Sequence, residues 1–347
     1  MHLFSNSSYC QENNSADWIF IYYMPYDNNL SYLGEDIIRM IKDGITSDKV
    51  IAVVQSDFDD TTGMYRYTIA KDKIIKTHIK NEYSARTSSF AQYMSWVDKN
   101  FSFKKSAVIL LDHGGKLDEL CLDEWPNESY LKVDSVRHTL DKFNQSQNKS
   151  IDLLFLQVCT KGSIEPLYEL RNTAQYTLSS QTVLGAPNYY YTNMLSDISN
   201  HPHRNGLDVA NLITQYERDD MYNSYTCLNN SKFETFRRKF NTLLSSVQNR
   251  IVLSSEPISK SYAGENYWDI VNFLIKIDLD GDKVKSRNEL IKFIEKELIV
   301  IYKKNPKIKW IDKYSGLSIG SSLEHNKYKS MLFFKEFKFK ITEVKKE

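Results

Sequence analysis

Two titratable residues stand just beyond apolar runs that are typical of buried strands. Residues 107–111 lead after one residue to His113, and residues 151–156 lead after two residues to Cys159. In an open parallel α/β sheet, the loops that follow the carboxyl ends of the strands carry the reactive groups. A cysteine beside a histidine is a nucleophile with its base or its ion-pair partner, which is the arrangement needed to make a thiolate at neutral pH.

Each of these residues alone has a plainer explanation. A cysteine after a strand is more often a small buried hydrophobe, and a lone histidine is more often a satisfied polar residue. The matching positions of His113 and Cys159 favour a pair, because one strand–helix–strand unit separates them and adjacent parallel strands would bring them side by side.

The elements needed to position this pair alternate along the first 180 or so residues. Continuous apolar runs predict buried strands, helical stripes lie between them, and two extended pieces around Lys71 and Asp72 predict a hairpin. This alternation predicts an α/β fold with an open, mostly parallel sheet and helices on both faces. The predicted strands are 18–24, 50–54, 107–111 and 151–156, the helices are 33–41, 88–97 and 131–143, and the hairpin strands are 64–70 and 73–79.

Beyond a further strand at 176–178 the pattern becomes mainly helical. We therefore divide the chain into a polar N-terminal segment (1–16), a catalytic core (17–204) and a mainly helical C-terminal region (205–347) that packs on the core and contributes late strands. The predicted helices of that last region are 206–220, 232–250, 266–276 and 286–303, and its predicted strands are 316–319 and 331–334.

The composition argues against two classes of binding partner. The 347 residues carry 45 Lys and Arg against 44 Asp and Glu, a net charge of +1, so neither nucleic acid nor a membrane is expected as a partner. No stretch approaches the roughly 18 apolar residues of a membrane span. Residues 1–8 lack the basic and apolar regions of a secretory signal, which predicts a cytoplasmic protein. The four cysteines show no CxxC spacing; apart from Cys159, we expect Cys10, Cys121 and Cys227 to be structural or free thiols.

The sequence resembles the clostripain-like cysteine peptidases, which are relatives of caspases, gingipains, legumain and separase. The resemblance covers residues from about 17 to 322, and the order and spacing of the shared segments make it specific. It rests on Ile21-Tyr22-Tyr23-Met24 with Asp27-Asn28-Asn29-Leu30, on Leu110-Leu111-Asp112-His113-Gly114-Gly115 and on Ile151 to Cys159, with weaker similarity at Tyr189–Thr192, Tyr267–Phe273 and Gly316–Ile319.

This resemblance implies a caspase-like three-layer α/β/α sandwich with a helical C-terminal annex. It implies a cysteine endopeptidase that acts on protein or peptide substrates through His113 and Cys159, with the backbone N–H groups of Gly114 and Cys159 as the oxyanion hole. No third side chain is required. Asp112 should be a structural neighbour, because adjacent residues at a strand end point to opposite sides.

The sequence departs from the family where the substrate's P1 side chain should bind. Family members that cut after Arg or Lys use two acids there, and the resemblance aligns Gln157 and Tyr190 with those positions. It also places Ser180 among the substrate-binding residues. Without the acids a buried guanidinium would be unpaired, so a simple Arg/Lys preference is not expected. A neutral polar pocket is one alternative, and a pocket for acidic residues built with Arg66 or Arg171 is another.

The segment in which relatives cleave themselves after a basic residue also differs. Residues 117–131 contain no Lys or Arg, although Lys116 and Lys132 flank them. We expect a regulated enzyme that is switched on by processing or by an activating partner protein. A pseudo-protease that serves as a binding scaffold, and a thiol hydrolase of small molecules, remain alternatives.

One motif resembles a calcium-binding loop. Asp278, Asp280, Asp282 and Glu289 occupy positions 1, 3, 5 and 12 of an EF-hand pattern, but Lys283 stands where glycine is required. We therefore favour a polar turn that caps a helix near 286 through Ser286 and Glu289. No metal site and no required cofactor are predicted, and calcium is the less favoured interpretation of this loop.

Overall fold

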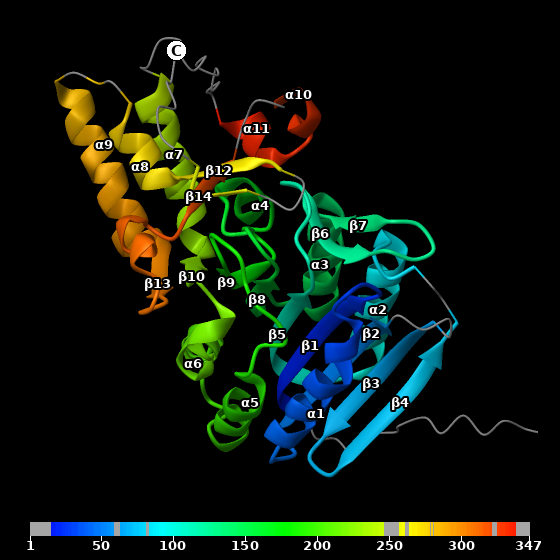
Figure 1. The fold of residues 1–347 in the computed structure, drawn as a ribbon. Helices are drawn as coiled ribbons and strands as arrows, with labels where there is room; N and C mark the ends of the chain where they lie inside the picture. The colour runs from blue at the N-terminus through cyan, green and yellow to red at the C-terminus, as the bar shows by residue number, and fades with distance from the viewer. Residues whose placement is uncertain are drawn as a thin grey trace, which may run out of the picture.

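The computed structural model describes residues 15–58, 63–80, 83–245, 257–260, 264–277, 279, 281–320 and 325–337. A nine-stranded sheet forms its centre (Figure 1). The strands in spatial order are β13 (Ile299–Lys304), β10 (Ser224–Asn229), β9 (Ala174–Ser179), β8 (Ile151–Gln157), β5 (Phe103–Leu111), β1 (Ala16–Tyr26), β2 (Val50–Phe58), β3 (Met64–Ala70) and β4 (Lys73–Ile79).

The five strands in the middle of the sheet, β9, β8, β5, β1 and β2, are parallel. The pairs at the two edges run antiparallel to their neighbours: β3 and β4 form the predicted hairpin, and β10 and β13 come from the region after residue 205. Strands buried on both faces need apolar residues at successive positions. In β1, Ile19 and Ile21 pack into one hydrophobic cluster while Trp18, Phe20 and Tyr22 pack into the other.

Helices cover both faces, as Figure 1 shows, so the described chain has three layers. One face carries α1 (Gly34–Gly44), α5 (Tyr191–Asn200) and α6 (Gly206–Tyr216). The other carries α2 (Thr87–Asn100), α3 (Val133–Gln147), α4 (Ile164–Glu169) and α7 (Phe233–Ser245). A two-stranded hairpin of β6 (Glu119–Asp123) and β7 (Ser129–Lys132) follows β5. Among the described residues, no helix has the length and apolar character needed to cross a bilayer.

The C-terminal region differs from the sequence-based prediction in several elements. The predicted helix 266–276 begins as a strand, and the predicted helix 286–303 ends in β13 at the sheet edge. Residues 331–334, predicted as a strand, belong mostly to a helix. The observed elements are β11 (Ser259–Lys260), β12 (Asn266–Asp269), β14 (Ser318–Gly320), α8 (Ile270–Ile275), α9 (Asp282–Phe293), α10 (His325–Tyr328) and α11 (Leu332–Glu336).

The predicted helix cap near 286 is wrong. Helix α9 starts at Asp282, and the Ser286 hydroxyl lies inside the helix, where it donates to the Asp282 carbonyl (3.2 Å). Glu289 is exposed on the same helix. Asp278 and Asp280, the first two members of the calcium-like pattern, lie outside the described residues. Within the described chain, no group of three or more His, Cys, Asp or Glu side chains is arranged to hold a metal ion.

Candidate active site

The loops after β5 and β8 lie side by side at the carboxyl edge of the sheet. The two strands pair in parallel, with Leu111 opposite Gln157, and the Asp112 N–H donates to the Gln157 carbonyl (3.4 Å). A Cβ added to Gly114 would lie only 2.4 Å from the Cys159 carbonyl oxygen, so glycine allows the two backbones to meet. The structure therefore brings the loop of His113 and Gly114 against the loop of Cys159.

His113 is held by a neighbour from the end of β1. Its Nε2 lies 2.6 Å from Asn29 Oδ1. Since an amide oxygen only accepts, this contact fits the tautomer that carries its proton on Nε2. Partial burial lowers the pKa of His113, and the Glu124 carboxylate opposes that shift. The imidazole is accordingly neutral at pH 7 and can act as a base.

The Asp112 carboxylate is hydrogen-bonded to two other segments of the chain. This buried carboxylate accepts hydrogen bonds from Asn28 Nδ2 (3.0 Å) and from the Leu122 N–H (2.6 Å). Burial raises the pKa of Asp112 well above its ordinary value. Through these contacts Asp112 joins the loop after β1 to hairpin β6–β7, and this arrangement fixes the backbone on which Asn29 stands.

Cys159 is partly exposed, and its sulfur faces the loop after β9. Sγ lies 3.4 Å from the Leu184 N–H and 3.6 Å from the Leu184 carbonyl oxygen. Burial raises the pKa of Cys159, while the Leu184 N–H and the Lys161 ammonium lower it and Asp112 adds to the increase. The resting sulfur is thus a thiol.

The residues after Cys159 turn sharply. Thr160 has a left-handed φ of +59°, and its N–H donates to the Thr182 carbonyl (2.8 Å). The Gly162 N–H donates to the Ser180 carbonyl (2.6 Å). Ser180 therefore lies beside the turn of the cysteine, but its side chain is fully buried and accepts from the Thr182 N–H (3.3 Å).

Gln157 and Tyr190 are brought together in a closed polar network. The Tyr190 hydroxyl donates to Gln157 Oε1 (2.7 Å), and Gln157 Nε2 donates to Asn188 Oδ1 (2.6 Å) and to the Tyr191 hydroxyl (2.8 Å). Tyr190 is fully buried.

Neither arginine considered for this pocket is directed to it. Arg66 donates to Gln55 Oε1 (2.8 Å), and its guanidinium lies 5.1 Å from the centre of the Trp96 ring. Arg171 pairs with Glu336 (3.4 Å) near the C-terminal region. A pocket for acidic side chains would need a different cation.

Three residues near this site escaped the sequence analysis. Asn29 was noticed only as part of a motif, and its role depends on the conformation of the loop after β1. Glu217 is a buried carboxylate that accepts from Asn188 Nδ2 (2.8 Å) and from the Tyr189 N–H (2.9 Å). Lys161 is fully buried beneath the loop of His113. Charged residues usually lie on the surface, so no sequence signal indicates that Glu217 and Lys161 are buried.

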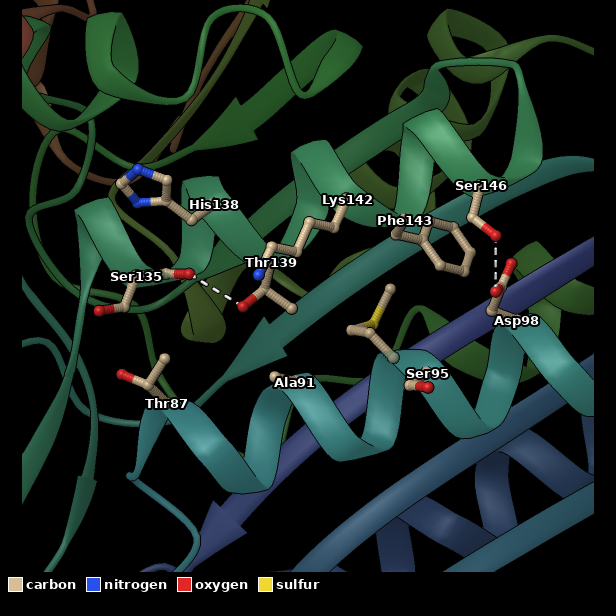
Figure 2. A pocket seen from close by; sticks show the side chains of 11 residues that line it. Thr87, Ala91, Ser95, Asp98, Ser135, His138, Thr139, Lys142, Phe143 and Ser146 are labelled. Atoms are coloured by element: carbon tan, nitrogen blue, oxygen red, sulfur yellow. Dashed lines mark hydrogen bonds between the residues drawn. The ribbon is translucent and has the colours of Figure 1, made fainter.

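A hollow elsewhere on the protein lacks comparable chemistry. A groove of about 350 Å³ lies between α2 and α3, and its lining includes His138 but no cysteine (Figure 2). Both ring nitrogens of His138 have neighbours: Nδ1 lies 2.7 Å from the Asp134 carbonyl oxygen and Nε2 lies 3.1 Å from Arg137. The carboxyl edge of the sheet is the better candidate.

The remaining described cysteines are poor nucleophile candidates. Cys121 and Cys227 are fully buried, and burial raises the pKa of each thiol. Cys10 lies outside the described residues. Cys159 is the described cysteine that combines partial exposure with a neighbouring histidine loop.

A mostly parallel sheet between two layers of helices, with a histidine and a cysteine on the loops of adjacent strands, fits a cysteine peptidase of the caspase-like class. A comparison with known protein families identifies the family within this class. The sequence matches the profile of the Clostripain family over residues 22–329, and the chain belongs to that family.

Solved structures agree with the fold. A secreted C11 cysteine protease from Bacteroides thetaiotaomicron, in complex with an irreversible peptide inhibitor, matches with a TM-score of 0.68 and 14% identity over 92% of this chain and 98% of that chain. An inactive zymogen C11 protease from Parabacteroides distasonis matches with a TM-score of 0.69 and 15% identity over 94% and 99%. At these identities the likeness confirms the predicted caspase-like fold. No curated protein matches the chain.

Proposed function

We propose that His113 and Cys159 are the catalytic dyad of a cysteine endopeptidase. The observation that carries the proposal is the meeting of their two loops, where the Gly114 backbone lies against the Cys159 carbonyl. The partial exposure of Cys159 and the contact between His113 and Asn29 support it. Asn29 then acts as a positioning residue that holds the imidazole in the tautomer with Nδ1 available as base.

In the proposed reaction, Sγ of Cys159 attacks the carbonyl carbon of the scissile peptide while the thiol proton moves to Nδ1 of His113. The electron pair of the C=O bond moves to oxygen, and the N–H groups of Gly114 and Cys159 stabilise that oxyanion. Collapse of the tetrahedral intermediate breaks the C–N bond, and the amine leaves with the proton from His113. Water, deprotonated by His113, then releases the acyl group and regenerates the thiol.

Gln157, Ser180 and Tyr190 are proposed to form the region that receives the P1 side chain. The amide of Gln157 is neutral, and Glu217 reaches it only through Asn188. A neutral polar P1 residue fits this chemistry better than Arg or Lys, because the Glu217 carboxylate in the described part of the site is already bound by Asn188 and by the Tyr189 N–H.

Regulation by a partner protein is proposed as well. The exposed connection between β6 and β7, residues 124–128, has no Lys or Arg at which an enzyme of basic specificity could cleave itself. Activity of the freshly purified chain that an added extract of the source cells does not increase would contradict this proposal. A cytoplasmic site of action likewise stays a prediction, which fractionation of the source cells would test.

Labelling with a peptidyl acyloxymethyl ketone tests the dyad. The thiolate displaces the carboxylate leaving group, so the wild type should gain one adduct on Cys159, and His113→Ala should label far more slowly. Cys121→Ala is the matched control and should label like the wild type, since that thiol is buried. An adduct on another cysteine, or none at all, would contradict the proposal and favour the pseudo-protease alternative.

A further inference from the structure

A lysine is buried two residues after the proposed nucleophile. Lys161 has no exposed surface. Taking an ammonium out of water costs several kcal/mol unless partners compensate for its lost hydration. Its Nζ donates to the Gly115 carbonyl (3.1 Å) and to the Lys116 carbonyl. Through these bonds the side chain binds the loop that follows His113.

The position of that loop makes the contact relevant to catalysis. Gly115 and Lys116 come directly after His113 and Gly114, and a Cβ added to Gly114 would lie 3.3 Å from Cε of Lys161. The lysine thus starts in the turn of Cys159, passes beside Gly114 and ends on two carbonyl groups of the histidine loop. It connects the loop of Cys159 to the loop of His113.

Acidic residues face the ammonium from two directions. Asp118 and Glu119 stand at the start of hairpin β6–β7, and Glu265 precedes β12; these three acids and Cys159 favour the charged form of Lys161. Two of the acids bind the same loop, since Glu119 accepts from the Lys116 N–H (2.9 Å) and Glu265 from the Leu117 N–H (2.7 Å).

Burial outweighs these acids and lowers the pKa of Lys161 to about 8. The ammonium is therefore the main form at pH 7, and it loses its proton within the range in which the enzyme can be assayed. In turn, its positive charge lowers the pKa of Cys159.

We propose that Lys161 is a positioning residue for the acyl-transfer reaction. Its ammonium fastens the backbone of Gly115 and Lys116 to the nucleophile turn, which fixes the N–H of Gly114, and its charge stabilises the thiolate and the oxyanion. This inference rests on the proposed dyad. It implies that turnover declines when Lys161 becomes neutral.

The test compares the wild type, Lys161→Met and Lys132→Met between pH 6 and 9.5. Methionine keeps the length and apolar stem of the lysine but removes the ammonium. Lys132 is the matched control, because it pairs with the same Asp118 (3.2 Å) and Glu119 (2.8 Å) from the surface. The readouts are kcat and KM on a cleaved peptide and the rate of Cys159 alkylation by iodoacetamide, which needs no oxyanion hole.

For Lys161→Met we expect kcat at pH 7 to fall by about 10²-fold, the usual effect of losing an oxyanion donor, with KM changed less than about threefold. Alkylation should fall by less than about tenfold, and the decline of wild-type kcat near pH 8 should disappear. Lys132→Met should keep both the activity and the decline.

An unchanged kcat in folded Lys161→Met, or an identical alkaline decline in both proteins, would overturn the inference. If Lys161→Met does not fold, the wild type still decides: a kcat that stays level from pH 7 to 9.5 contradicts a role for the ammonium. Failure of the dyad itself looks different, because the wild type would then neither cleave peptides nor react at Cys159.

Discussion

Replacing Asn29 by aspartate should move the pH at which the peptidase becomes active. Asn29 Oδ1 lies 2.6 Å from Nε2 of His113, so Asn29→Asp places a carboxylate against the imidazole with almost no change in shape. An opposite charge at this range favours the protonated ring. Two unit charges about 4 Å apart interact by about 1 kcal/mol in bulk water and about 4 kcal/mol near a protein surface, and about 1.4 kcal/mol corresponds to one pKa unit.

Because Asn29 is exposed and His113 is only half-buried, the lower part of this range applies. We expect the acid limb of kcat/KM to move upward by about one to two pH units, which reduces activity at pH 6 by at most about tenfold for each of those pH units and leaves activity above pH 8 near the wild-type value. Asn29→Ala removes one hydrogen bond and should lower kcat about three- to tenfold without shifting the limb in this direction.

The assay is kcat/KM on a peptide substrate from pH 5 to 9, in buffers of constant ionic strength. Asn200→Asp adds the same charge at the exposed end of α5 and should leave the profile unchanged. An Asn29→Asp enzyme with the acid limb of the wild type would refute the assignment, because it would mean that His113 does not titrate as the catalytic base or does not contact residue 29.

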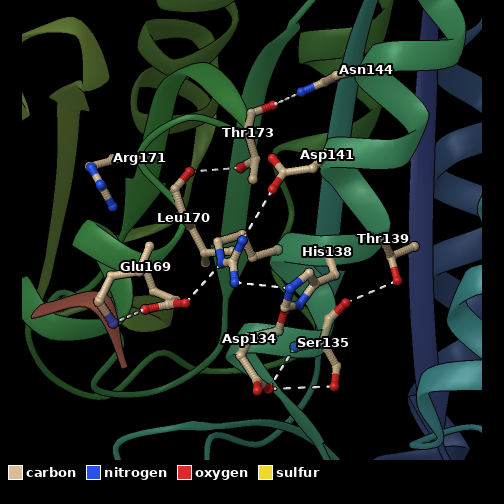
Figure 3. A network of polar contacts seen from close by, with 12 residues as sticks. Asp134, Ser135, His138, Thr139, Asp141, Asn144, Glu169, Leu170, Arg171 and Thr173 are labelled. Atoms are coloured by element: carbon tan, nitrogen blue, oxygen red, sulfur yellow. Dashed lines mark hydrogen bonds and ion pairs between the residues drawn. The ribbon is translucent and has the colours of Figure 1, made fainter. Parts of the chain in front are cut away.

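Three further outcomes are expected. Because burial raises the pKa of Cys159, its alkylation by iodoacetamide should accelerate continuously from pH 7 to 9; a rate that is already level at pH 6 would mean a resting ion pair. Gln157→Asp should raise kcat/KM for Arg or Lys at P1 by about tenfold or more relative to neutral residues, and unchanged selectivity would remove residue 157 from the P1 pocket. Arg137 binds the buried Glu169 carboxylate at 2.8 Å (Figure 3). Arg137→Met leaves this carboxylate without its ion-pair partner and should lower the free energy of unfolding in urea by about 3 kcal/mol. If the double variant Arg137→Met/Glu169→Gln regains none of that stability, loss of the ion pair is not the cause of the destabilisation.

The Arg137 contact also shows how distant parts of the chain are joined. Arg137 of α3 binds Glu169 at the end of α4, whose other oxygen accepts from the Leu332 N–H (2.6 Å) at the start of α11. Three elements that are far apart in sequence thus share one carboxylate. This ion pair is structural in our account, so its loss should act on stability rather than on the pH profile of catalysis.

The central strands were predictable because a parallel sheet covered on both faces needs continuous apolar residues, and the runs at 107–111 and 151–156 alternate with helical stripes as such a sheet requires. The apolar run 331–334 was ambiguous. A short run fits a strand or one buried helical turn equally well, and packing against α4 selects the helix. In the predicted helix 286–303, the β-branched residues from Ile299 to Ile301 add a strand beside β10 instead.

The placement of His113 and Cys159 on neighbouring loops could be predicted because it depends only on strand order. Their supporting residues could not. Asn29 reaches His113 because Asn28 pins the loop after β1 to Asp112 and to the Leu122 carbonyl (2.8 Å), and Lys161 is buried only because two carbonyl groups meet its ammonium. Such contacts depend on loop conformation, which a single sequence does not specify.

The central claim is that Cys159 cleaves peptide bonds, and cleavage profiling tests it most directly. A peptide library derived from a proteome is incubated at neutral pH with the wild type and with Cys159→Ala, and new termini are identified by mass spectrometry. Our account predicts cuts made by the wild type alone, preferentially after neutral residues. Cuts made equally by both proteins, or an absence of cuts together with a Cys159 that no electrophile labels, would contradict it.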